Sequence, residues 1–95
     1  TVYVGSFDDH LYAVDTASGQ EQWSFKTDDA IASSPAISGG TVYVGSFDGH
    51  LYAVDTATGQ EQGSFKTDDR VWSAAAILGG TVYFGSADDA LYAVK

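Results

Sequence analysis

The chain of 95 residues contains 13 Asp and Glu but only 4 Lys and Arg, so its formal net charge is −9 at pH 7. Such a surface repels nucleic-acid phosphates and anionic membranes, whereas it suits cations, basic partners or the high salt of a halophilic environment. The absence of cysteine excludes a disulfide framework, a thiolate metal site and a cysteine nucleophile, and no apolar run is long enough for a membrane helix.

A β-rich stretch at 1–15 returns at 41–55 and again at 81–95, each time with an offset of 40 residues. In the middle copy, TVYVGSFDGHLYAVD, the dipeptide Asp48-Gly49 separates two β-rich runs. Asp-Gly at such a place predicts a hairpin, because Gly accepts the positive φ of a tight turn. An all-β repeat of about 40 residues is typical of a propeller blade or a β-solenoid.

The repeat divides the chain into units 1–40 and 41–80 and a partial unit 81–95. One such unit cannot bury its faces without a neighbour, so we expect residues 1–95 to form one propeller segment. The chain begins inside a unit, without Met, and stops directly after the third hairpin. We therefore expect it to be a piece of a longer propeller, or to assemble with further copies of itself.

Each complete unit contains four β-like runs, which we expect to form a four-stranded antiparallel blade. The two runs of the hairpin are apolar on both faces, which predicts central strands covered on both sides. The next run, at 21–27 and 61–67, alternates apolar and polar residues and is expected at the outer rim. The last run, at 31–38 and 71–78, is rich in Ala and Ser. Because Pro35 cannot donate to a ladder, we expect this run to be the innermost edge strand.

Docking between adjacent blades is expected from three aromatic side chains of the rim runs, Trp23, Phe25 and Phe65. The second unit has Gly63 where the first has Trp23, which predicts a hole of indole size. Inner and rim runs lie at opposite edges of a blade. We therefore expect Trp72, in the inner run, to line the axial side or a loop face instead of filling this hole.

Residues 43–60 contain the pattern Y-V-G-S-x-D-G-x-L-Y-A-V-D-x-x-T-G, which Trp23, Phe25 and the SSPA of 33–36 complete. This pattern resembles the PQQ-type (quinoprotein-like) β-propeller repeat over the whole chain, whereas the Trp-Asp dipeptide of WD40 blades is absent. The resemblance implies an all-β fold of four-stranded antiparallel propeller blades, with a partial propeller in each chain. The family includes PQQ-dependent dehydrogenases, the propeller lipoprotein of the outer-membrane assembly machinery, and sensor and scaffold domains. It thus favours an extracytoplasmic location.

The dehydrogenases of this family hold Ca²⁺ and the quinone with loop residues that find no counterpart here, so the resemblance implies no cofactor. His10 and His50 recur at one blade position, but the third copy has Ala90, and we interpret both as polar residues that follow a turn. No serine lies in a nucleophile elbow, and the Asp-Asp pairs lack the spacing of a calcium loop. We expect no catalytic residue and no ordered metal.

The up-and-down topology of a blade places the hairpin turns and the rim-to-inner connections at the same edge of the propeller. This edge collects nine of the 13 acidic residues. They are Asp8, Asp9, Asp28, Asp29, Asp48, Asp68, Asp69, Asp88 and Asp89. We expect a strongly negative face that binds basic proteins or cations weakly and with strong salt dependence.

Three hypotheses for the function follow. The first is a non-catalytic scaffold or protein-interaction segment, either a fragment of a larger propeller or a self-assembling multi-blade ring. Its partners would be other blades of the same or identical chains. The second is a fragment of a PQQ-dependent dehydrogenase whose active-site residues lie outside the segment. The third is an engineered or recently amplified repeat with no evolved partner.

Overall fold

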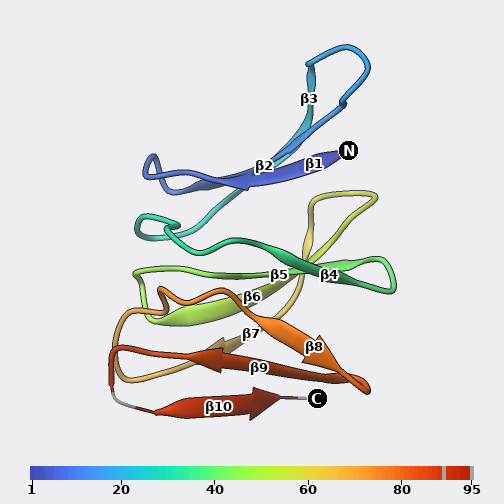
Figure 1. Ribbon diagram of the computed structural model, residues 1–95. Coiled ribbons are helices and arrows are strands. Elements are labelled where there is room, and N and C mark those ends of the chain that lie inside the picture. Colours follow the sequence, from blue (N-terminus) through green and yellow to red (C-terminus); the bar gives the residue numbers. More distant parts are fainter. Residues whose placement is uncertain (89, 95) are drawn as a thin grey trace.

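The computed structural model describes residues 1–88 and 90–94, in which ten β-strands and no helix occur (Figure 1). The all-β prediction is confirmed. Within these residues no helix could span a membrane. Asp89, one of the nine acidic residues expected at one edge, lies outside the described part of the chain.

The strands form three antiparallel sheets, and the spatial order of the strands follows the chain. The first sheet contains β1 (Val2–Gly5), β2 (His10–Val14) and β3 (Glu21–Lys26). The middle sheet contains β4 (Ala36–Ser38), β5 (Thr41–Gly45), β6 (His50–Asp55) and β7 (Glu61–Lys66). The third sheet contains β8 (Ala76–Leu78), β9 (Thr81–Gly85) and β10 (Leu91–Val94). The middle sheet is thus the complete four-stranded blade that the repeat predicts.

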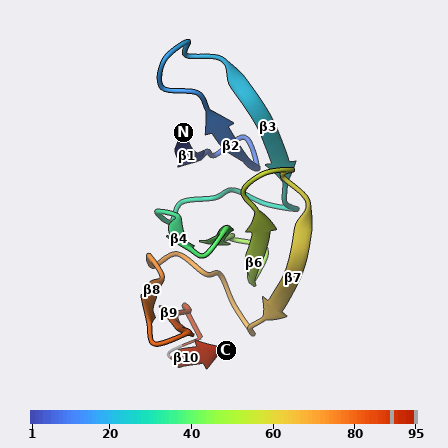
Figure 2. The same cartoon turned by 90° about the vertical axis from the view of Figure 1, so that its right-hand side faces the viewer.

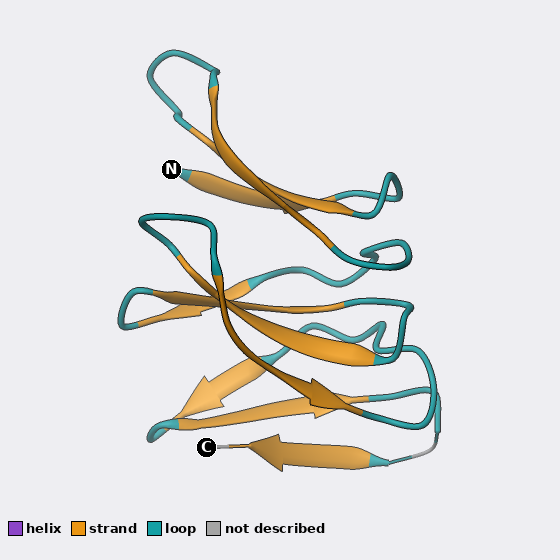
Figure 3. Cartoon of the chain, turned by 180° about the vertical axis from the view of Figure 1, so that it is seen from behind, coloured by secondary structure: helices purple, strands orange, loops and turns teal. Residues whose placement is uncertain are grey.

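The three sheets stack face to face (Figure 3). In Figure 2 the rim strands β3 and β7 lie along one side of the stack, and the short strands β4 and β8 lie along the other. β4 is the edge strand of the middle sheet, as Pro35 predicts. The order from inner edge to rim is therefore confirmed.

The inner strands are shorter than predicted. We expected strands over 31–38 and 71–78, but β4 and β8 cover only the last three residues of each run. The first half of each run does not pair, and only its alternate residues pack between the sheets. Ile31 lies against Gly5 and is 1% exposed, and the hydroxyl of Ser33 binds both the N–H and the carbonyl of Gly45 at 3.0 Å.

The hairpin turns form where the glycine pattern predicts them. Gly49 has φ 89°, and Asp9 takes the same left-handed conformation, with φ 76°, at the equivalent position of the first unit. At the other end of the blade, Gly59 has φ 77° and donates its N–H to the carbonyl of Asp55 at 2.9 Å. The Asp55 side chain accepts a further hydrogen bond from the N–H of Ala57 at 3.0 Å. Local turn chemistry therefore determines the register of these hairpins.

Two hydrophobic clusters fill the spaces between the sheets. The first cluster contains Leu11, Ile31, Val42, Val44, Tyr52 and Val54. The second contains Leu51, Val71, Val82 and Phe84. The middle sheet contributes to both clusters, so the prediction that its central strands are covered on both faces is confirmed.

Candidate functional site at the blade interfaces and the loop edge

Trp23 lies on β3 and reaches from the first sheet to the middle sheet. Its indole N–H donates to the carbonyl of Thr56 at 2.8 Å, and its ring centroid is 5.8 Å from that of Tyr3. The ring also packs on Gly59, where an added Cβ would lie 2.6 Å from the indole Cδ2. The predicted docking residue therefore joins a rim strand to the loop between β6 and β7 of the next blade. Phe25 accompanies it, in edge contact with the ring of Tyr52 at 5.3 Å.

The second interface contains Phe65 but no tryptophan. Phe65 meets Tyr92 at 5.4 Å and Phe84 at 6.0 Å between ring centroids, both in edge orientation. Beside it, at Gly63, the two sheets leave a groove of about 260 Å³. Trp72 lies elsewhere, on a loop next to Phe47, and is 59% exposed. A loop position is one of the two that we expected for it.

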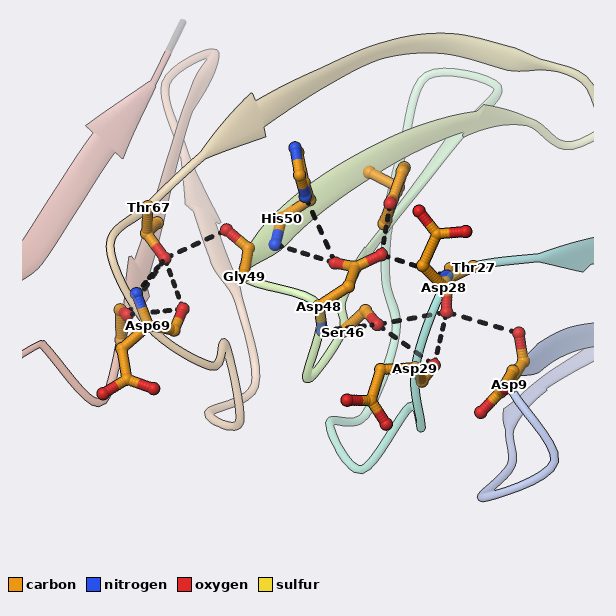
Figure 4. Close-up of polar contacts among 12 residues, drawn as sticks. Asp9, Thr27, Asp28, Asp29, Ser46, Asp48, Gly49, His50, Thr67 and Asp69 are labelled. Atoms are coloured by element: carbon orange, nitrogen blue, oxygen red, sulfur yellow. Dashed lines mark hydrogen bonds and ion pairs between the residues drawn. The ribbon is translucent and has the colours of Figure 1, made fainter.

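Buried hydroxyl groups, which were not predicted from the sequence, join the blades. Thr27 donates to the carbonyl of Asp29 at 2.6 Å, and its oxygen lies 3.0 Å from that of Ser46 on the next blade (Figure 4). Thr67 and Ser86 repeat the pair at 3.1 Å in the second interface. Each pair recurs with the 40-residue period, which is the one signal in the sequence that could have found it.

Asp48 is a structural residue of the loop edge, because its carboxylate ties together two blades. One oxygen accepts hydrogen bonds from the hydroxyl of Tyr52 and, at 3.2 Å, from the N–H of Asp28 on the preceding blade (Figure 4). The other oxygen accepts from the N–H of His50 at 2.9 Å. Asp88 makes the same bonds to Tyr92 and to the N–H of Asp68.

The first and third units repeat the pair of a tyrosine and an aspartate. The hydrogen bond that Tyr12 donates holds the pKa of Asp8 below its ordinary value, and the bond from Tyr92 does the same to the pKa of Asp88. In return, the bond to Asp88 raises the pKa of Tyr92 to about 12. Burial, followed by the bond to Asp48, raises the pKa of Tyr52 as well. The carboxylates of Asp8, Asp48 and Asp88 therefore have a structural role, because each accepts a hydrogen bond from a tyrosine of its own hairpin.

The two histidines follow the hairpin turns, where the repeat places them. The Nδ1 of His50 lies 3.3 Å from a carboxylate oxygen of Asp48, and its ring faces that of Tyr52 at 5.6 Å. The Nδ1 of His10 lies 2.9 Å from the carbonyl of Asp8. Over residues 1–88 and 90–94, no three Asp, Glu or His side chains come close enough together to hold a metal ion.

The acidic loops emerge together at one edge of the stack, at the left of Figure 1. The eight acidic residues of this edge that the structure describes fall into two groups. The exposed ones are Asp8, Asp28, Asp29, Asp68 and Asp69. The half-buried ones are Asp9, Asp48 and Asp88. Most of the exposed carboxylates of this edge thus lie in the connections that follow β3 and β7, where Asp69 pairs with Arg70 at 3.9 Å.

The raised tyrosine pKa values predict a loss of stability in alkali. The bond to Asp88 raises the pKa of Tyr92 to about 12 in the folded chain, whereas its ordinary value is 10.0. A raised folded-state pKa means that this stabilisation is complete below pH 10 and is lost as the pH rises through 12. We therefore expect the midpoint of thermal unfolding, followed by circular dichroism, to fall between pH 10 and 12. The fall should be smaller in Tyr92→Phe. Identical profiles for the two proteins would contradict this assignment.

Comparisons with known proteins place this arrangement in a family. The family model described as outer membrane protein assembly factor BamB matches residues 1–95. The solved structure of BamB from Moraxella catarrhalis superimposes with a TM-score of 0.84 at 25% identity, over 96% of this chain and 28% of that one. A search of curated proteins finds no match.

Two further solved structures share the blade stack. The computationally designed Ika4 protein has a TM-score of 0.80 at 23% identity, over 96% of this chain and 57% of that one, and shows the fold alone. Quinohemoprotein alcohol dehydrogenase from Comamonas testosteroni has a TM-score of 0.80 at 28% identity, over 90% of this chain and 15% of that one. The chain therefore spans less than two thirds of each of these proteins. Its three stacked sheets are a partial β-propeller. Because the family model matches from end to end, the chain belongs to the BamB family of PQQ-type β-propeller repeats.

Proposed function

We propose that the chain is a non-catalytic propeller segment, a scaffold whose two outward sheet faces dock further blades. The observation that carries this proposal is the exposure of interface residues on the first sheet. Val2 and Val4 are 47% and 46% exposed, whereas Val42 and Val44, their counterparts in the middle sheet, are fully buried against the first sheet. The outward face of the first sheet is therefore chemically the same as a face that already docks a blade.

The third sheet presents the complementary face. Leu91 is 77% exposed, whereas its counterparts Leu11 and Leu51 are 0% and 4% exposed because each is covered by the next sheet. Tyr83 beside it is 38% exposed. The two ends of the stack thus carry the two halves of one interface. Further blades of the same chain, or identical copies of this segment, would bury both halves.

The roles of the loop side chains favour a scaffold over an enzyme. Asp48 and His50 hold a hairpin, and Thr27 and Ser46 join two blades, so each of these reactive groups has a structural partner. The five exposed aspartates of the loop edge suit a basic protein or weakly bound cations, as an interaction module would use them. The likeness to quinohemoprotein alcohol dehydrogenase supports one alternative, a dehydrogenase segment whose active-site residues lie outside this chain.

Light scattering on the purified 95-residue chain tests the proposal. At 0.15 M salt we expect a particle that contains two or more chains of 10.0 kDa each, because head-to-tail contact buries both outward faces. Val4→Glu and Leu91→Glu, one on each face, should lower that mass. Ala57→Glu, on an exposed loop of the middle sheet at the opposite edge, should leave it unchanged. A folded monomer of 10.0 kDa in the unmodified protein would contradict the proposal.

A further inference from the structure

We propose that the groove beside Gly63, between the middle and third sheets, binds a planar aromatic ring of the indole type. This inference goes beyond the scaffold proposal, because the ligand is a small molecule and its site lies within a single chain. The groove has a volume of about 260 Å³. Its apolar lining consists of Tyr43, Leu51, Ala53, Phe65, Val82 and Val94.

The first interface of the same molecule shows what this groove is shaped to hold. There Trp23 occupies the position equivalent to Gly63, and its indole ring lies beside Tyr3. Tyr43 is the counterpart of Tyr3 at a spacing of 40 residues. The strand partner is also repeated, because Ala13 pairs with Trp23 and Ala53 pairs with Gly63.

The facing sheet is repeated as well. Val42 and Val54 belong to the hydrophobic cluster against which Trp23 packs. Their counterparts Val82 and Val94 line the groove beside Gly63. The walls of the second interface are therefore those of an indole site, while residue 63 itself contributes no side chain to fill it.

The groove has the room and the chemistry that an aromatic ring requires. An added Cβ at Gly63 would meet no atom within 4 Å, so the space begins at the backbone. An apolar cavity of about 150 Å³ in another protein holds benzene, and this groove is larger. The rings of Tyr43 and Phe65 offer faces and edges for stacking. Gln62 and Ser64, on either side of Gly63, are exposed, so a ligand can enter from solvent.

Nuclear magnetic resonance titration with indole tests this site in the unmodified chain. We expect shifts of the amide signals of Gly63, Val82 and Val94, with a Kd on the order of 1 mM for a ligand of this size. Gly63→Trp should abolish the shifts, because its own side chain fills the groove. Gly63→Ala adds one methyl group and should retain binding.

Trp23→Gly provides the matched variant, since it opens the equivalent space in the first interface. It should bind two indole molecules per chain, with new shifts near Tyr3 and Val54. Absence of shifts in the unmodified chain, or undiminished binding by Gly63→Trp, would overturn the proposal. Because the unmodified chain and Gly63→Trp both keep Trp23, the test stands even if Trp23→Gly does not fold.

Discussion

Replacing Trp23 by alanine should lower the free energy of unfolding by about 3 kcal/mol. The change removes a large ring from the first interface and leaves the carbonyl of Thr56 without the hydrogen bond that it now accepts at 2.8 Å. The ring is only partly buried, so we place the loss at the low end of the range for buried tryptophan. Denaturant titration followed by circular dichroism measures the effect.

Trp72→Ala is the matched control for this prediction. Trp72 is 59% exposed, and its removal should change the free energy of unfolding by no more than about 0.5 kcal/mol. A loss below about 1 kcal/mol for Trp23→Ala would show that Trp23 does not stabilise the interface. Equal losses for the two variants would lead to the same conclusion.

Replacing Gly45 by alanine should destabilise the chain by about 1–3 kcal/mol. A Cβ at this position would lie 2.2 Å from the Cγ1 of Val71 and 3.1 Å from its carbonyl oxygen. Val71 is fully buried in the second cluster, so it can yield only by moving other core residues. Thermal and denaturant unfolding should both show the loss.

Gly63→Ala is the control that separates crowding from the general effect of glycine in a strand. Gly63 also lies within a strand, but an added Cβ meets nothing within 4 Å. Alanine lowers the entropy of the unfolded chain, so we expect this variant to be neutral or more stable by up to about 1 kcal/mol. If the two substitutions changed stability in the same direction, crowding against Val71 would not be the cause.

The secondary structure could be predicted because it depends on neighbouring residues. The turn at Gly49 needs only a residue that accepts positive φ, and alternating polarity identified β7 as a rim strand. The prediction was wrong where a run serves packing instead of pairing. Ile31 and Ser33 read as strand residues, but they contact Gly5 and Gly45 between the sheets. Local propensity does not distinguish these two uses of a small, apolar segment.

Some features of the candidate sites could likewise be predicted from the sequence, whereas others could not. The repeat alone predicted Trp23 as a docking residue, Gly63 as the place of a hole, and the loops that carry the acidic residues. The stacking of the sheets was needed to find the pairing of Thr27 with Ser46, because these side chains meet across two blades. It was also needed to show that Asp48 is engaged by Tyr52 and is not a free surface charge.

By itself, the sequence determined the repeat, the order of strands in a blade and the edge at which each loop emerges. These properties follow from spacing, alternation and turn residues, all of which act within one unit. The tertiary structure decided which faces are buried and which remain outward. Val4 and Val44 stand in nearly identical local sequence, yet one is 46% exposed and the other 0%. Burial is a property of what packs against a residue, and in a repeat protein the neighbouring unit supplies it.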